Sequence, residues 1–476
     1  MLKKTLLISG SRFALALCAG LALTGVKTAS AQTVAGNTGC LIPGVSGATT
    51  ASSTSRRGVS AAWRAAPRPS GAPPTVAGAA ARAASTSTAV AATPIRRLLV
   101  RSTGTIVPCP PLAARYRHGA PEPLAPPWLT APMATHEREL TDPVDLCTPD
   151  GRRLAPGARG WSRRPLHTAN LDGVWGRTKR WDYWAILAGE HAIAVTYADV
   201  DYLGIAEVWW CHLPSGRTGG HALNRPGSRG IALPDRPGTA PLRASSDQLD
   251  LRIIDDEGGT DLEVAWTEAD GTPGSLRARV ELPEGHESLN VVIPWSDRRF
   301  QYTSKHQARP AHGELVVAGE SIAFGGDDGP EAWGVLDVGR GRWPYRTRWN
   351  WGGGAGRSVE GAVVGIQIGG RWTEGTGATE NGVIVDGRLA KIGQELSWEY
   401  SWDEPLAPWR VRHPDGSLDL ALAPIHDRHS AVQAVVLATE VHQVFGTWTG
   451  HVTAEDGTVH HLEGVQGFAE ESRSRW

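Results

Sequence analysis

Acidic, basic and aromatic residues gather in one stretch, Trp333–Leu389, where their types and spacing could do chemistry. Asp337 and Glu380 are the candidate catalytic acids, because a carboxyl held against indole rings loses hydration. Its pKa then rises, and it can protonate an alkene or a carbonyl. Trp349 and Trp351 lie two residues apart and share one face of a strand, either as a core layer or as a pocket wall. This stretch is typical of a lined pocket.

Other charged residues extend the candidate site. Asp337 and Arg340 lie three residues apart, so we expect an ion pair that either orients a ligand or pins the following turn. With Arg340 beside it, Asp337 would be the anion and Glu380 the acid. Lys305 is either a Schiff-base or anion-binding lysine, or an exposed lysine at a rim. The expected ligand-binding residues are Lys305, Arg340, Trp343, Tyr345, Trp349, Trp351 and Asn381, although Glu380-Asn381 could instead cap a turn.

Metal, nucleotide and nucleic-acid chemistry have little support in the sequence. Cys147 and Cys211 form no Cys-x-x-Cys or Cys/His ligand spacing, and His442 and His460-His461 lack clustered cysteines or carboxylates, so we expect no metal. The glycine run after Trp351 lacks the strand–helix context of a phosphate loop, so we expect no cofactor. A net charge of -1 gives no reason to expect nucleic acid as a partner.

The elements that must position these residues are strands. Apolar and polar residues alternate, or apolar residues run for strand lengths, almost everywhere after residue 133. Asp386-Gly387 and similar pairs mark hairpin turns, and only Ser430–Leu437 fits a helix as well as a strand. We therefore predict an all-β chain of two antiparallel β-barrels or strongly curved sandwiches packed together, at residues 142–310 and 311–476. The motif stretch would lie in the second.

The N-terminal part has a different composition. Residues 1–31 have the basic start, apolar core and small-residue cleavage site of a secretory signal. Residues 32–132, rich in Ala, Pro and Arg, are expected to be disordered. Normal acid content begins at Met133, an alternative translation start. The first start predicts export to the periplasm or medium, the second a cytoplasmic protein. No segment is apolar over a membrane-spanning length, so no integral membrane segment is expected.

In combination, the motifs resemble the bacterial "domain of unknown function 2804" family from about Asp142 to Trp476. The motifs are Leu336-Asp337-Val-Gly-Arg340-Gly-x-Trp343-Pro-Tyr345, Trp349-x-Trp351, Ala378-Thr379-Glu380-Asn381 with Asp386-Gly387, Tyr302-Thr-Ser-Lys305 and Gly467-Phe-Ala-Glu470. The first 132 residues lie outside this pattern. More distantly, the family is similar to the paired lipocalin-like barrels of carotenoid hydratases, which implies a fold and no established reaction.

Two functions follow from these residues and this resemblance. The first is a lipocalin-like protein that encloses an apolar small molecule, such as a lipid, terpenoid or polyketide, and isomerises, hydrates or cyclises it without a cofactor. The second is a non-catalytic module that binds a carbohydrate or a lipid. An enzyme needs Asp337 or Glu380 buried at a closed site, whereas a sugar-binding module presents tryptophans in an open groove.

Overall fold

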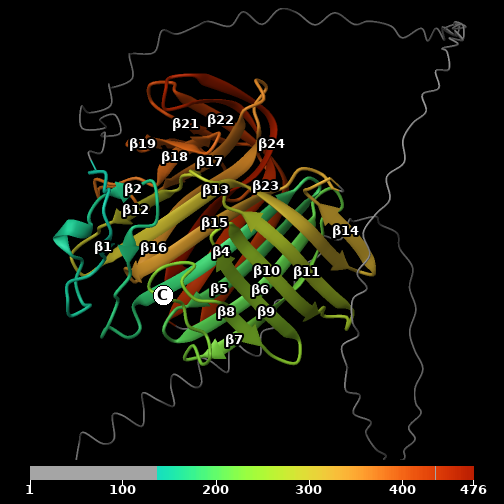
Figure 1. Ribbon diagram of the computed structural model, residues 1–476, viewed down its shortest axis with the longest axis horizontal. Helices are drawn as coiled ribbons and strands as arrows, with labels where there is room; N and C mark the ends of the chain where they lie inside the picture. Colours follow the sequence, from blue (N-terminus) through green and yellow to red (C-terminus); the bar gives the residue numbers. More distant parts are fainter. Residues whose placement is uncertain (1–136, 328, 435, 476) are drawn as a thin grey trace, which may run out of the picture. The chain divides into compact units, whose positions relative to one another are not determined.

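The structure, a computed structural model, describes residues 137–327, 329–434 and 436–475, which belong to one compact unit (Figure 1). Within these ranges the chain is built almost wholly from antiparallel strands, with one 3-10 helix, η1 (Pro156–Ala158). No helix in the described ranges is long and apolar enough to cross a bilayer. The expected signal, the expected disordered stretch and Met133 lie outside the described residues.

The first sheet has 13 strands, and its main path runs β7-β6-β5-β4-β15-β13-β11-β10-β9-β8. These strands are β4 (Thr178–Ala188), β5 (His191–Asp199), β6 (Leu203–His212), β7 (Arg217–Pro226), β8 (Leu242–Ser245), β9 (Leu249–Asp256), β10 (Gly259–Thr267), β11 (Pro273–Glu281), β13 (Phe300–Val317) and β15 (Trp333–Arg342). Three strands attach to the side of this path: β2 (Trp161–Ser162), β12 (Leu289–Ile293) and β14 (Glu320–Phe324). A separate parallel pair joins β1 (Val144–Asp145) to β3 (His167–Thr168).

The second sheet has 9 strands in the order β19-β18-β17-β16-β24-β23-β22-β21-β20. They are β16 (Arg346–Arg357), β17 (Val363–Gly370), β18 (Asn381–Val385), β19 (Arg388–Ile392), β20 (Ser397–Glu399), β21 (Trp409–Arg412), β22 (Leu418–Ala434), β23 (Leu437–Thr453) and β24 (Val459–Arg475). Asp386 and Gly387 join β18 to β19 with φ of 46° and 80°, the left-handed conformation that a tight hairpin turn requires. Of the ambiguous stretch, residues 430–434 end β22 and residue 437 begins β23.

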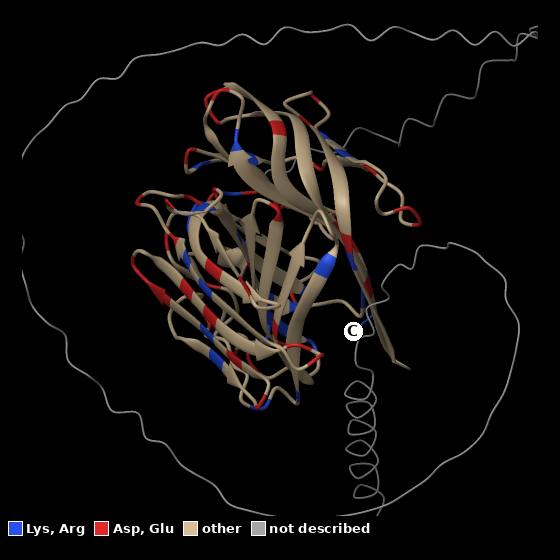
Figure 2. Cartoon of the chain, turned by 90° about the vertical axis from the view of Figure 1, so that its right-hand side faces the viewer, with Lys and Arg blue, Asp and Glu red and all other residues tan. Residues whose placement is uncertain are grey.

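Each sheet curls around its own apolar core, so the predicted all-β fold of two curved antiparallel sheets is confirmed. Trp184, Leu251 and Leu276 lie in the core of the first sheet, and Trp409 and Trp448 in that of the second. Figure 2 shows charged residues of both signs interspersed along strands of the sheet that lies lower in the view. The opposite, uncharged face of these strands is the one that packs inward.

The two sheets also pack against each other. A third cluster joins Leu187 and Val335 of the first sheet to Trp351, Phe445 and Phe468 of the second. Strand β15 therefore has protein on both faces, and all ten of its residues are buried. Because successive side chains alternate, one set points into the first core and the other into the contact between the sheets.

The passage from one sheet to the other differs from the division expected near residue 310. Thr303–Gly313 lies inside β13, and the chain leaves the first sheet only after Arg342. Pro310 does not interrupt β13: it follows a register shift between His306 and Arg309 and is itself the register partner of Trp333 on β15. The motif stretch is consequently divided between both sheets instead of lying in the second alone.

Candidate functional site

A buried lysine lies between two carboxylates where the sheets meet. Lys305 Nζ is 2.9 Å from Asp337 Oδ1 and 3.3 Å from Glu380 Oε2. The side chains of Lys305, Asp337 and Glu380 are only 6%, 10% and 1% exposed, so this is no rim lysine. The ammonium group neutralises charge that burial would otherwise make very costly. We call Lys305, Asp337, Glu380 and the nearby Glu470 the carboxylate cluster.

Strand register brings the first pair together. Lys305 on β13 lies directly opposite Asp337 on β15, and neighbours in such positions have their side chains on the same face. Asp337 is held further by the Trp181 indole N–H (3.0 Å) and by the Thr303 hydroxyl (3.2 Å). Gly339, two residues after Asp337 on β15, leaves room for Trp181, because a Cβ on Gly339 would lie 2.2 Å from the indole ring.

Glu380 comes from the second sheet, immediately before β18. The Trp372 indole donates a hydrogen bond to Glu380 Oε1. A Cβ on Gly369 of the neighbouring β17 would lie 2.1 Å from the same oxygen, so only glycine leaves this space. Glu380 Oε2 is buried and faces the Lys305 ammonium group at 3.3 Å.

Two tryptophans of β16 cover the cluster from the second sheet, and they share one face as their spacing predicts. The Lys305 ammonium lies 4.4 Å from the centre of the Trp351 ring, a cation–π contact. The Trp349 indole donates to Glu470 Oε1 at 2.7 Å, which brings a third carboxyl beside the first two. Trp351 in turn donates to Gln367 at 3.1 Å, and the Gln367 amide donates to the backbone oxygen of Glu380 at 3.1 Å.

Burial changes the protonation of these acids. It raises the pKa of Glu380 to about 7, although Lys305 opposes the shift. Burial likewise raises the pKa of Glu470 to about 7, against the hydrogen bond from Trp349. For Lys305, burial works toward a lower pKa, but the attraction of Asp337 and Glu380 outweighs it and the pKa is raised. The site thus combines a lysine that stays protonated, Lys305, with two carboxyls whose pKa values lie near neutral pH, Glu380 and Glu470.

Indole rings form the wall beside the cluster. Trp343 stacks on Trp372 with 5.4 Å between ring centroids and 9° between planes, and it also contacts Trp181, Trp295 and Trp349. Trp343 and Trp372 are 3% and 7% exposed, so these rings do not line an open groove. Trp181, Trp295 and Trp349 are only partly buried and form the accessible side of the wall.

Arg340 corrects one expectation from the sequence: it does not pair with Asp337. Positions three apart on a strand face opposite ways, and Arg340 points toward the first core, where it lies 2.8 Å from Asp182. It also donates to the backbone oxygen of Trp181 at 2.7 Å. Arg340 therefore braces β4 against β15, and Lys305 is the cation beside Asp337.

Two other residues that were expected to bind the ligand, Tyr345 and Asn381, make hydrogen bonds to protein groups outside the carboxylate cluster. Tyr345 is 37% exposed in the turn before β16 and donates to the backbone oxygen of Val436. Asn381 accepts a hydrogen bond from the Gly369 N–H at 2.7 Å and donates to the Gln394 backbone oxygen at 3.0 Å. Asn381 thus ties the segment that carries Glu380 to β17 and to Gln394.

Several residues of the site stand out in the sequence, but their sequence pattern does not predict that they belong to the site. Trp181 and Tyr183 alternate on β4 as Trp349 and Trp351 do on β16, and Tyr183 meets Trp351 edge-on at 5.7 Å. Glu470 belongs to the closing Gly467-Phe-Ala-Glu470 motif without an evident role until β24 is placed beside β16.

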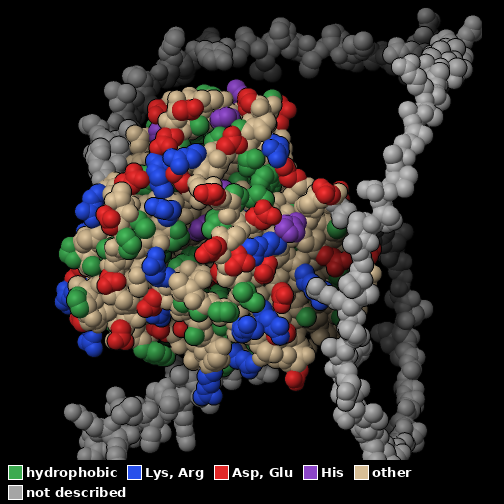
Figure 3. All heavy atoms as spheres, viewed as in Figure 1, with side chains coloured by type: hydrophobic (Ala, Val, Ile, Leu, Met, Phe, Trp, Pro, Cys, Tyr) green, Lys and Arg blue, Asp and Glu red, His purple; other side chains and the backbone are tan. Residues whose placement is uncertain are grey.

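A separate hollow of about 630 Å³ lies over β7, β8 and β9, and it is not the site proposed below. It is a shallow surface feature lined by Arg225, Arg243 and Arg252, with Asp250 lying 3.2 Å from Arg252. On the face seen in Figure 3, basic and acidic side chains are intermingled in the same way. The carboxylate cluster, in contrast, combines buried acids, a buried cation and aromatic walls.

Three solved structures are similar to part of the chain. Kievitone hydratase from Nectria haematococca aligns with a TM-score of 0.38 and 11% identity over 63% of this chain and 89% of that chain. A putative AttH protein from Nitrosomonas europaea gives 0.37 and 12% over 62% and 92%, and CghA gives 0.33 and 12% over 64% and 90%. No curated protein sequence matches the chain. Across residues 137–476 the sequence matches the model described as "Domain of unknown function (DUF2804)", and the chain belongs to that family.

Proposed function

We propose that the protein binds an apolar small molecule beside the carboxylate cluster and moves protons on it without a cofactor. The observation that carries this proposal is the pair of buried acids, Glu380 and Glu470, whose pKa values burial raises to about 7. A general acid or base works best when its pKa lies near the pH of its surroundings. Two such groups beside one lysine allow one acid to give a proton while the other accepts one.

The indole rings beside the carboxylate cluster indicate the chemical class of the bound molecule. Indole rings offer flat apolar surfaces, so they favour an unsaturated hydrocarbon skeleton such as a terpenoid or polyketide. The Lys305 and Asp337 side chains keep small accessible areas, 6% and 10%, which supports the proposal that a molecule reaches the cluster. Lys305 and Asp337 would hold a polar substituent of the molecule, and Glu380 would face its reacting carbon.

The proton inventory of such a step is balanced. In a hydration, the Glu380 carboxyl gives its proton to one alkene carbon while water attacks the other, and Glu470 takes the proton that the water loses. In an isomerisation, Glu380 protonates one carbon and Glu470 removes a proton from another. Either way, one carboxyl gains the proton that the other gives, and solvent exchange restores the starting state.

Glu380→Gln tests the assignment, because it keeps size and hydrogen bonding while removing the proton. The lipophilic compounds that copurify with the protein would be extracted, identified by mass spectrometry and returned to purified wild type and variant. We expect wild type to convert a compound that the variant binds but turns over at least a hundredfold more slowly.

Glu395→Gln is the matched control. Burial also raises the pKa of Glu395 to about 7. Its carboxyl, however, accepts a hydrogen bond from the Thr373 hydroxyl and not from Lys305. This variant should convert the compound as wild type does. If Glu380→Gln turns it over at the wild-type rate, the catalytic role is lost. If wild type binds the compound and does not change it, the cluster serves a non-catalytic binding module.

A further inference from the structure

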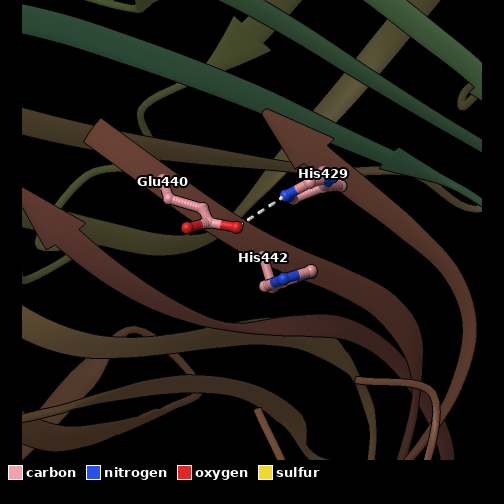
Figure 4. A group of neighbouring side chains, drawn as sticks. All are labelled: His429, Glu440 and His442. Atoms are coloured by element: carbon pink, nitrogen blue, oxygen red, sulfur yellow. Dashed lines mark hydrogen bonds and ion pairs between the residues drawn. The ribbon is translucent and has the colours of Figure 1, made fainter. Parts of the chain in front are cut away.

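Three potential metal ligands lie together on the hairpin formed by β22 and β23. His429 on β22 is the register partner of His442 on β23, and Glu440 lies two residues before His442 on the same face. Figure 4 shows the three side chains gathered on this face, with Glu440 reaching toward His429. The sequence does not reveal the group, because pairing across the hairpin brings His429 to the other two.

The distances suit a small cation. One ligand atom from each of His429, Glu440 and His442 lies within 4.8 Å of the others. His429 Nε2 and Glu440 Oε1 are 3.3 Å apart. Bonds of about 2.0–2.1 Å to a tetrahedral Zn²⁺ place neighbouring ligand atoms roughly 3.3 Å from each other. The His429 and His442 rings are stacked, with 4.3 Å between centroids and 9° between planes, so the exposed His429 ring must turn before both imidazoles can bind one ion.

An independent contact prepares His442 for this role. Its Nδ1 lies 2.7 Å from Asp427 Oδ2, so the carboxylate holds the proton on Nδ1 and leaves Nε2 as a lone-pair donor. Histidines that bind metal in proteins have this partner on their other nitrogen. The edge-on Trp402 ring, 4.5 Å from His442, further limits rotation of the imidazole.

We propose that His429, Glu440 and His442 bind a divalent first-row transition metal of the Zn²⁺ class, with Asp427 orienting His442. Two imidazoles and one carboxylate suit Zn²⁺, Co²⁺, Ni²⁺ and Cu²⁺, whereas Ca²⁺ and Mg²⁺ prefer oxygen ligands throughout. Three protein ligands leave a further position open to solvent. The metal ties β22 to β23 near the tip of their hairpin and is independent of the proton chemistry proposed above.

Zinc titration of the chelator-treated full chain, purified without a histidine tag, tests this site by calorimetry. We expect one tight Zn²⁺ site per chain that millimolar Mg²⁺ does not compete for. The double variant His429→Ala/His442→Ala should lose this site, and Asp427→Asn should weaken it about 10–100-fold. Zinc should raise the Tm of wild type but not of the double variant.

A second histidine pair on the same sheet provides the control. His451 and His461 face each other across β23 and β24 with ring centroids 6.4 Å apart, and Glu360 lies 2.7 Å from His461. His461→Ala should bind zinc as wild type does. Retention of the tight site by the double variant would overturn the assignment, and so would its loss in His461→Ala. Comparable circular dichroism of all variants under chelator shows that folding is not the cause.

Discussion

Lys305 carries one positive charge, and the carboxyls of Asp337, Glu380 and Glu470 compete for it. Asp337 lies closest to its Nζ, at 2.9 Å, and also accepts hydrogen bonds from Trp181 and Thr303. Burial is the larger cause of the raised pKa of Glu380 and of Glu470, and the electrostatic effect of Asp337 on both carboxyls acts in the same direction.

The raised pKa of Glu380 gives stability a defined pH dependence. An ordinary glutamate has a pKa of 4.5, whereas that of Glu380 is raised to about 7. Between these values the folded state holds a proton that the unfolded chain has lost, so this contribution is complete below pH 4.5 and disappears as the pH rises through 7. Replacing Glu380 with Gln should therefore remove on the order of 3 kcal/mol of this decline.

Urea denaturation of wild type and Glu380→Gln between pH 4 and pH 8 would measure the difference. Glu374→Gln, which removes a well-exposed carboxyl from the same segment, serves as the charge-matched control. If the free energy of unfolding depends on pH in the same way for wild type and Glu380→Gln, Glu380 has the same pKa in the folded protein as in water, and the assignment is wrong.

At this scale the sequence predicts residue types better than their partners. The shared face of Trp349 and Trp351 follows from strand periodicity alone, and the structure places them so. The same periodicity should separate Asp337 from Arg340, yet proximity in the sequence favours pairing them. The true partner of Asp337, Lys305, is far away in sequence and is set by the register of β13 against β15.

At the scale of elements, close approach of β17 to the segment before β18 positions Glu380. Gly369→Ala would place a methyl group 2.1 Å from Glu380 Oε1, so the carboxyl must move away from Trp372 and Lys305. We expect the variant to lose roughly 1–3 kcal/mol of stability, typical of overpacking in a core, together with any turnover. Chemical denaturation and the conversion assay described above measure the two effects.

Gly157→Ala is the control for this substitution, because nothing lies within 4 Å of a Cβ there. It should change neither quantity. Wild-type stability and turnover in Gly369→Ala would show that Glu380 need not occupy its observed position.

Strand existence follows readily from the sequence, whereas the neighbours of each strand do not. Residues 289–293 and 409–412 alternate or run apolar and form β12 and β21. The buried run in β15 also reads as a strand, but its period does not show that both faces are covered by different sheets. That depends on long-range packing, which local propensity does not encode.

At the scale of the whole molecule, all the described strands lie within the region that matches the family model, residues 137–476. We therefore expect a chain lacking residues 1–132 to keep the Tm of the full protein within about 2 °C, a shift that corresponds to roughly 1.5 kcal/mol for a folded region of this size. Differential scanning calorimetry of both proteins measures this.

A slightly longer deletion makes the comparison sharper. Glu137 Oε1 lies 2.7 Å from Lys391 Nζ, and both side chains are under 10% exposed. Removing residues 1–140 leaves that lysine buried without this carboxylate and should lower the Tm clearly. An equal loss in the shorter deletion would place part of the folding core before residue 133.

The position of β24 has a consequence for biosynthesis. Strand β16 pairs with β24, which is far away in the sequence, and Trp351 lies opposite Glu470. More than a hundred residues must therefore leave the ribosome after Trp351 before its partner does. During that interval the first sheet can complete its own hairpins, while one edge of β16 and the indoles of Trp349 and Trp351 stay uncovered. A nascent chain arrested before β24 would therefore present a ready surface for chaperones and carry Asp337 and Lys305 without Glu470.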